Sequence, residues 1–251
     1  YLKFLETPKM LFVILCFLAF MLSVFSKAQA VVLPIVLILI DLLENRQTAM
    51  KKLVQKIPFL VVSIIFGIIA IESQKSAGAM QGAVFSFADR FLFASYGFEN
   101  YLWQTLFPYD LSIFYPYPET NLVINSNWVY LGPVVVIAGT VAAFYFGKKH
   151  PMILFGYLFF CVNIALVIQL LPVGDAIHAD RYTYLSLVGF FLVAGYLISK
   201  WQERSPDKKT VIMGLIGGIT LVFGLLSFSY AKKWSDSITI YSHALEKHPA
   251  P

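Results

Sequence analysis

Apolar residues along the chain are grouped into long runs that short polar segments separate. The runs are about 17 to 22 residues long, which suits α-helices that cross roughly 30 Å of hydrocarbon at about 1.5 Å per residue. No run alternates as a barrel strand does, and backbone groups in lipid need hydrogen-bond partners within the chain. We therefore predict membrane-spanning helices at about 10–26, 29–43, 57–73, 128–146, 151–172, 184–200 and 210–230.

The composition supports a membrane environment. Hydrophobic residues make up 59% of the chain, charged residues only 13%, and the mean hydropathy is +0.73. A soluble domain carries roughly 25% charged residues, so a water-soluble fold is excluded. The predicted fold class is all-α, a polytopic membrane helix bundle of about seven spanning helices.

The basic residues indicate topology. The net charge is +5, but Lys and Arg gather at helix ends, in the segments 44–56, 148–149 and 200–209. Positive loops stay on the cytoplasmic side, so all three are predicted to be cytoplasmic. A nucleic-acid partner would need one continuous basic face, and none is expected.

The apolar segment 85–107 does not fit this topology as a spanning helix. It contains Asp89, Arg90, Glu99 and Asn100. If it crossed the membrane, the last two basic segments would lie outside. We therefore predict an amphipathic helix in the outer interface. The outer face then holds 74–127, 173–183 and the tail from 231, where any chemistry is expected.

The ends and the cysteines add little. Cys16 and Cys161 lie within apolar runs and are interpreted as small core residues. The first run has no small-residue cleavage site, so no signal peptide is predicted. The chain starts at Tyr1 without an initiator Met and stops at Pro251. We expect a longer protein on both sides.

The tail 231–251 contains a predicted helix. Ile238, Tyr241, Ala244 and Leu245 lie at i, i+3, i+6 and i+7, and Pro249 ends the pattern. The spacing resembles the closing helix of a tetratricopeptide repeat, although an ordinary amphipathic helix fits equally well. The domain prediction is a transmembrane domain at 1–230 and the start of a repeat region at 231–251.

The loop 174–184 before the sixth predicted helix is crowded with ionisable groups. It contains Asp175, His178, Asp180 and Arg181. The planar fork of Arg181 suits a phosphate at the outer interface, whereas an Asp180–Arg181 ion pair is the structural alternative. His178 is a candidate base. With no second histidine or cysteine nearby, no metal site is predicted.

Other charged residues lie close to the apolar runs. Lys27 sits in a predicted outer turn, where it either snorkels to the interface or contributes to a site. Asp41 is interpreted as a helix-end ion pair with the basic loop that follows. Glu72 and Lys75 are interpreted as a solvated pair three residues apart.

The segment 108–118 contains three prolines and is predicted to be extended. It could line a groove for an acceptor peptide or sugar, and a plain structural loop is equally compatible. Tyr115 and Tyr117, together with His178 and Asp180, are the candidates for this acceptor or loop site.

Three stretches together, 26–41, 111–118 and 179–185, resemble the bacterial relatives of the transmembrane and tetratricopeptide-repeat O-mannosyltransferases. These are type C glycosyltransferases that use polyprenyl-phosphate sugars. The resemblance implies sugar transfer from a lipid-phosphate donor to an acceptor, with a catalytic carboxylate in a first outer loop that would precede this chain. Ala28 departs from the acidic residue or proline that the family often has there. We expect this chain alone to be inactive.

The resemblance also implies site roles and a location. Arg181, with Tyr182 and Lys27, is expected to contact the donor phosphate. The expected partners are the bilayer, a lipid-linked sugar and a protein acceptor reached through the repeat region, and the expected location is a bacterial inner membrane with a periplasmic tail. A non-catalytic membrane anchor that presents a repeat domain remains an alternative, as does a transporter.

Overall fold

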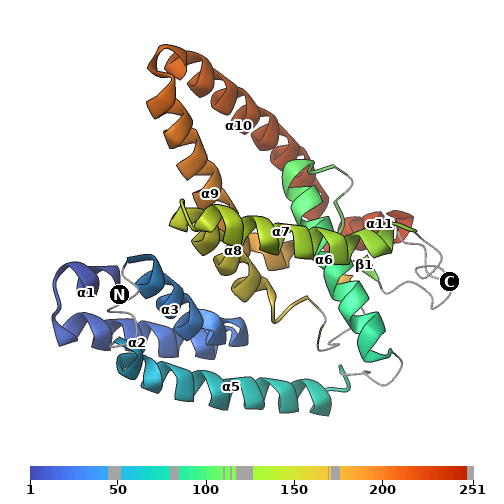
Figure 1. The fold of residues 1–251 in the computed structure, drawn as a ribbon. Helices are drawn as coiled ribbons and strands as arrows, with labels where there is room; N and C mark the ends of the chain where they lie inside the picture. Colours follow the sequence, from blue (N-terminus) through green and yellow to red (C-terminus); the bar gives the residue numbers. More distant parts are fainter. Residues whose placement is uncertain are drawn as a thin grey trace.

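The computed structural model describes residues 1–44, 52–79, 85–109, 111–113, 115–116, 127–168, 170 and 176–247. These residues are mostly helical, as predicted (Figure 1). The α-helices are α1 (Leu2–Glu6), α2 (Met10–Ser26), α3 (Leu33–Glu44), α5 (Ile57–Ser76), α6 (Phe87–Leu106), α7 (Leu131–Gly147), α8 (Pro151–Ile164), α9 (Thr183–Arg204), α10 (Lys209–Ala231) and α11 (Ser237–Lys247).

Three helical segments are long and apolar enough to cross a membrane. They contain α5, α9 and α10 with their flanking 3-10 turns, and run over Leu53–Ser76, Asp180–Arg204 and Pro206–Trp234. Their lengths are 24, 25 and 29 residues. α2, α7 and α8 are apolar but shorter. By length and composition these helices suit a membrane protein.

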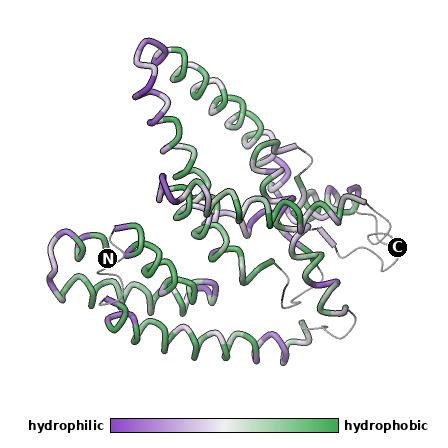
Figure 2. The backbone as a smooth tube through the Cα atoms, in the orientation of Figure 1, coloured by the Kyte–Doolittle hydropathy of each residue, from purple (hydrophilic) through white to green (hydrophobic). Residues whose placement is uncertain are grey.

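The surfaces of the long helices are apolar. Only 6% of the apolar stretch of α10 and 11% of that of α5 is buried inside the protein. Ile64 of α5 and Leu221 of α10 are 62% and 65% exposed. Figure 2 shows hydrophobic residues along most of the length of both helices. Surfaces this apolar are rare on monomeric soluble proteins, and they suit contact with lipid.

The helices pack in two groups. Phe20, Leu37 and Phe59 form a core among α2, α3 and α5. Phe98 of α6 and Phe160 of α8 belong to a second core. α3 also packs against α8 and so connects the two groups.

Glycines permit two close helix crossings. A Cβ on Gly156 of α8 would lie 2.5 Å from the carbonyl oxygen of Gly189 of α9. A Cβ on Gly132 in the first turn of α7 would lie 2.5 Å from the backbone of Ser95 of α6. Backbones can approach this closely only where side chains are absent. α6 thus crosses α7 at one end of α7, and it runs across the direction of α5 and α7 (Figure 1).

Two parts of the fold differ from the sequence-based expectation. The fifth predicted helix, 151–172, ends at Ile164, and a turn follows. The fold is also not purely α, because β1 (Tyr115–Pro116) pairs with β2 (Ala176–His178) in an antiparallel two-stranded sheet. The prolines keep β1 extended, and an extended backbone that leaves the bilayer surface can satisfy its polar groups by pairing with another strand.

The tail forms the predicted helix, α11. Ala244 is buried, but Ile238, Tyr241 and Leu245 are 81%, 63% and 56% exposed. The other buried residue is Ile240, which lies one turn before Ala244 on the same face. Ala244 is thus packed among the described residues, whereas Ile238, Tyr241 and Leu245 are not covered by them.

Candidate functional site

A cavity of about 560 Å³ lies between the ends of α2 and α3 on one side and α8 and α9 on the other. The short 3-10 helices η1 (Ala28–Val32) and η4 (Asp180–Tyr182) contribute to its rim. Its lining consists of Ser23, Lys27, Gln29, Ala30, Val32, Leu33, Val36, Phe159, Asn163, Arg181, Tyr182, Tyr184 and Leu185.

The three residues expected to contact a donor phosphate line this one cavity. Lys27 ends α2 as its C-cap, while Arg181 and Tyr182 belong to η4 at the start of α9. Packing of α3 against α8 connects the elements that carry them. Two cationic side chains and a phenol from distant parts of the sequence therefore lie around the same space.

Arg181 is held from two sides. Its Nη1 donates a hydrogen bond of 3.1 Å to the carbonyl oxygen of Ile113, and its Cζ lies 5.0 Å from the ring centroid of Tyr182. No ion pair joins Asp180 and Arg181 within the part of the chain that the structure describes. Because a guanidinium has five N–H donors, the bond to Ile113 leaves others for an anion.

Sequence reasoning missed Asn163. This residue of α8 is 1% exposed and lines the cavity. Its Nδ2 donates to the carbonyl oxygen of Phe159 at 2.8 Å, whereas its Oδ1 is buried without a protein partner among the described residues. The side chain of Gln29 donates to the carbonyl oxygen of Asn163 at 3.3 Å. An asparagine within an apolar run is costly in lipid, and that signal was present in the sequence.

Much of the cavity lining is apolar. Val32, Leu33 and Val36 approach it from η1 and α3, and Phe159 and Leu185 from α8 and α9. The cavity thus brings cationic and hydrocarbon-like side chains together around one space. This combination suits an amphiphile with an anionic head.

Behind Arg181, the hydroxyl of Tyr115 joins three elements. It accepts hydrogen bonds of 2.9 Å from the backbone N–H of Ser112 and from the side-chain amide of Gln104. It donates at 3.5 Å to Oδ2 of Asp180, whose Oδ1 is buried without a partner among the described residues. Burial, with a smaller effect from the Asp180 charge, raises the pKa of the Tyr115 phenol above its usual range. The phenol therefore stays protonated and can donate to Asp180.

His178 lies in an aromatic cluster. It is 3% exposed, stacks on Tyr115, and meets the rings of Tyr101 and Tyr96 edge-on at 5.4 and 6.4 Å. It does not line the cavity. This position favours a packing role over that of a general base, which must reach its substrate.

Tyr117 and Asp175 lie outside the described residues. Within the described ranges, no three His, Cys, Asp or Glu side chains gather closely enough to hold a metal ion.

No protein family, curated protein or solved structure matches the chain in sequence or fold comparisons.

Proposed function

We propose that the chain is the later part of the membrane domain of a type C glycosyltransferase, which transfers a sugar from a polyprenyl-phosphate donor to an acceptor on the outer face of a bacterial inner membrane. One observation carries the proposal. Lys27, Arg181 and Tyr182 line one cavity together with apolar side chains of η1, α3, α8 and α9.

The chemistry of the cavity supports a phosphate on a long apolar chain. A guanidinium binds phosphate oxygens in a fork, and an ammonium adds a second positive charge. The wall of Val32, Leu33 and Phe159 offers the isoprenoid a surface that excludes water. In this assignment Asn163 contributes a buried carbonyl oxygen that can accept a hydrogen bond from a sugar hydroxyl.

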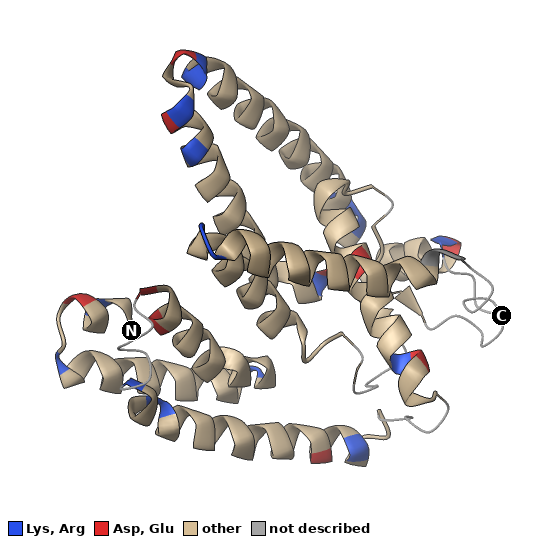
Figure 3. Ribbon diagram, viewed as in Figure 1, with Lys and Arg blue, Asp and Glu red and all other residues tan. Residues whose placement is uncertain are grey.

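The arrangement of the helices supports the proposed topology of seven spanning helices, namely α2, α3, α5, α7, α8, α9 and α10. In α2, Lys27 follows the last residue and Lys9 precedes the first. In α9, Arg181 lies just before the start and Lys200 lies near the end. Figure 3 shows basic residues at the α7–α8 turn, at the α9–α10 turn and near the start of α5, all toward the left of the view. α6 runs across this direction, as an interfacial helix would (Figure 1).

The test is donor binding to the full-length protein in nanodiscs, with a fluorescent polyprenyl phosphate as the probe. Arg181→Ala should weaken binding about tenfold to a hundredfold, the equivalent of roughly 1.5 to 3 kcal/mol for a lost charge-assisted bond. Arg181→Lys should recover only part, because lysine keeps the charge and loses the fork. Arg204→Ala, at the other end of α9, is the matched control and should bind normally. If Arg181→Ala binds the probe as tightly as the wild-type protein, the proposal is wrong.

The exposed face of α11 favours a second candidate, a non-catalytic anchor that presents a protein-interaction domain. Ile238, Tyr241 and Leu245 form an apolar face on this helix that the described residues leave uncovered. A sugar-transfer assay on the full-length protein separates the two candidates. An anchor shows no transfer with any polyprenyl-phosphate sugar, while its helical domain still captures a protein partner.

A further inference from the structure

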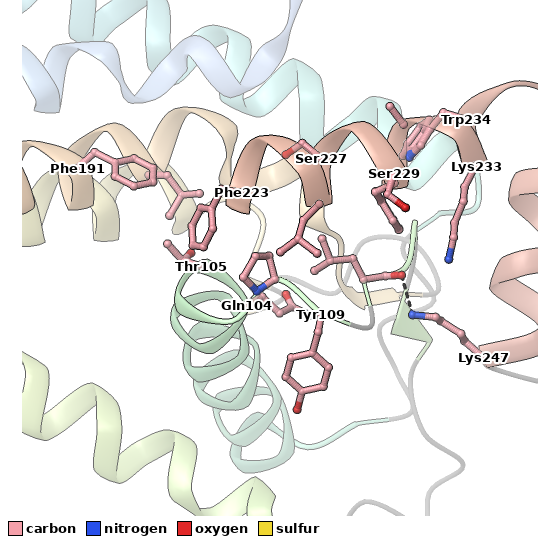
Figure 4. A pocket seen from close by; sticks show the side chains of 16 residues that line it. Gln104, Thr105, Tyr109, Phe191, Phe223, Ser227, Ser229, Lys233, Trp234 and Lys247 are labelled. Atoms are coloured by element: carbon pink, nitrogen blue, oxygen red, sulfur yellow. Dashed lines mark hydrogen bonds between the residues drawn. The ribbon is translucent and has the colours of Figure 1, made fainter. Parts of the chain in front are cut away.

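A second cavity, of about 770 Å³, lies among α6, α9, α10 and α11 (Figure 4). α9 and α10 diverge from the turn that joins them (Figure 1). Leu187 and Phe191 of α9 line one part of the cavity together with Phe223 and Leu226 of α10. It shares no lining residue with the cavity around Arg181.

The other part of the cavity is polar and cationic. Lys233 and Lys247 line it, and Figure 4 shows both on the side away from Phe191 and Phe223. Hydroxyl groups reach the same region from the last turn of α10, and Trp234 stands beside them. The residues that line the described cavity include no Asp or Glu.

Contacts within the protein hold both lysines at the cavity. Nζ of Lys247 donates at 2.8 Å to the carbonyl oxygen of Leu111, and Nζ of Lys233 is hydrogen-bonded to the imidazole of His243. α11 thereby brings Lys247 back to the end of α10. The charge of Lys247 also acts on the carboxylate of Asp180, which does not line this cavity.

We propose that this cavity binds an anionic membrane phospholipid, with its phosphate between Lys233 and Lys247 and its acyl chains between α9 and α10. The apolar and cationic parts follow one another in the order in which a phospholipid presents its chains and its headgroup. A tryptophan at the boundary suits the depth of the headgroup. A free phosphate ion would make no favourable contact with the apolar part. The inference requires only that the helices lie in a membrane and does not depend on the proposed glycosyltransferase activity.

Fluorescence of Trp234 reports whether a lipid occupies the cavity. The full-length protein, carrying Trp103→Phe, Trp128→Phe and Trp201→Phe, would be reconstituted in phosphatidylcholine nanodiscs with a small fraction of brominated lipid. Any tryptophan outside 1–251 would be replaced in the same way. Brominated phosphatidylglycerol should quench Trp234 more strongly than brominated phosphatidylcholine at the same mole fraction.

The lysine variants test the headgroup contact. Lys233→Gln and Lys247→Gln should each reduce the preference for phosphatidylglycerol about fivefold, as expected for a lysine near an anionic lipid. Lys233→Arg and Lys247→Arg should keep the preference, which separates lost charge from lost folding. Lys232→Gln is the matched control, because Lys232 precedes Lys233 but does not line the cavity. Its preference should equal that of the parent.

Four outcomes would overturn the proposal. Equal quenching by both lipids would mean that the lysines do not select the headgroup. If Lys232→Gln reduced the preference for phosphatidylglycerol as much as Lys233→Gln and Lys247→Gln do, general surface charge would select the headgroup instead. Quenching by neither lipid would mean that a protein segment fills the space. Added inorganic phosphate should leave quenching unchanged, and displacement of the lipid by millimolar phosphate would identify a free-anion site instead.

Discussion

The imidazole of His178 stacks on the ring of Tyr115, with ring centroids 4.0 Å apart and planes 11° from parallel. The two residues are also paired in the register of the β1–β2 sheet. This contact joins the proline-rich segment to the segment that carries Asp180 and Arg181. The position of the Arg181 guanidinium therefore depends on a loop about seventy residues earlier in the sequence, through Ile113 as well as Tyr115.

Tyr115→Phe should loosen this connection while keeping the stacked ring. It removes the hydroxyl that Ser112, Gln104 and Asp180 share, and a lost partner for buried polar groups costs roughly 1 to 3 kcal/mol. Thermal unfolding in detergent measures the loss, and hydrogen exchange should rise in 176–182. Tyr145→Phe is the control, because Tyr145 is 68% exposed. Equal behaviour of the two variants would contradict a connecting role for the Tyr115 hydroxyl.

The sequence predicted the positions of several helices well, because the length of an apolar run can be read from the local sequence. α2, α5 and α10 begin within one residue of the predicted starts at 10, 57 and 210. The ion pairs at Asp41 and Glu72 were also predicted, and the structure confirms both. Lys75 lies three residues after Glu72 in one helix, and Lys56 belongs to the basic segment that follows Asp41, so helix geometry and the adjacent basic loop were enough to suggest the two pairs.

The missed features depend on contacts between distant segments. The sheet pairs Tyr115 with His178, and neither strand is long enough for its own pattern to be recognised. The cavity position of Asn163 depends on η1 approaching α8, where Gln29 bonds to its carbonyl. Composition and periodicity contain no information on which helices meet. Arg181 and Lys27 were singled out separately, and only the fold could place them around one cavity.

Gly156→Ala should separate α8 from α9. The added Cβ would lie 2.5 Å from the Gly189 carbonyl oxygen and 2.3 Å from a methyl carbon of Val193. Overpacking of this kind costs about 1 to 3 kcal/mol, more than the helix propensity that alanine gains. The expected result is a lower midpoint of unfolding in detergent. Gly195→Ala, on α9 with no atom within 4 Å of the new Cβ, should be neutral or slightly stabilising. A similar loss in both variants would contradict close packing at Gly156.

The stability of the first turn of α11 should fall at acidic pH. Oδ1 of Asp236 accepts the backbone N–H of Thr239 at 2.8 Å, and Oδ2 accepts hydroxyl hydrogen bonds from Thr239 and Ser235. The side-chain bond from Thr239 is the main cause that lowers the pKa of Asp236 to about 2. For a depressed carboxyl pKa, the cap stabilises the helix above about pH 4, and this stability is lost as the pH falls toward 2.

The measurement is the Thr239 amide proton shift in the selectively labelled full-length protein. Its midpoint should fall near pH 2. Asp236→Asn is the control, because asparagine caps a helix without a titrating charge and should abolish the transition while keeping α11. A midpoint near pH 4 in the parent protein would show that Asp236 does not cap the helix in solution.

The strongest stability effect is expected at the ion pair of Asp41 and Lys56, whose side chains are each only 1% exposed. Nζ of Lys56 donates to Asp41, to the hydroxyl of Tyr1 at 2.9 Å and to the carbonyl oxygen of Lys52 at 3.2 Å. Tyr1 in turn donates to Asp41 at 2.7 Å. All three ammonium protons are thus used. Removing one partner leaves a buried charge uncompensated, so Asp41→Ala should cost about 3 to 5 kcal/mol in unfolding.

Two comparisons separate this cost from the net value of the pair. Asp41→Leu combined with Lys56→Met removes both charges, and it should be nearly neutral, because the gain from a buried pair roughly offsets its desolvation. Glu72→Gln breaks the solvent-exposed pair with Lys75 and should change stability by about 1 kcal/mol or less. Reversible unfolding in detergent of the four proteins, including the parent, gives the values. If Asp41→Ala and Glu72→Gln lose the same small amount, water or lipid headgroups reach Lys56, and the pair is not buried in the membrane-embedded protein.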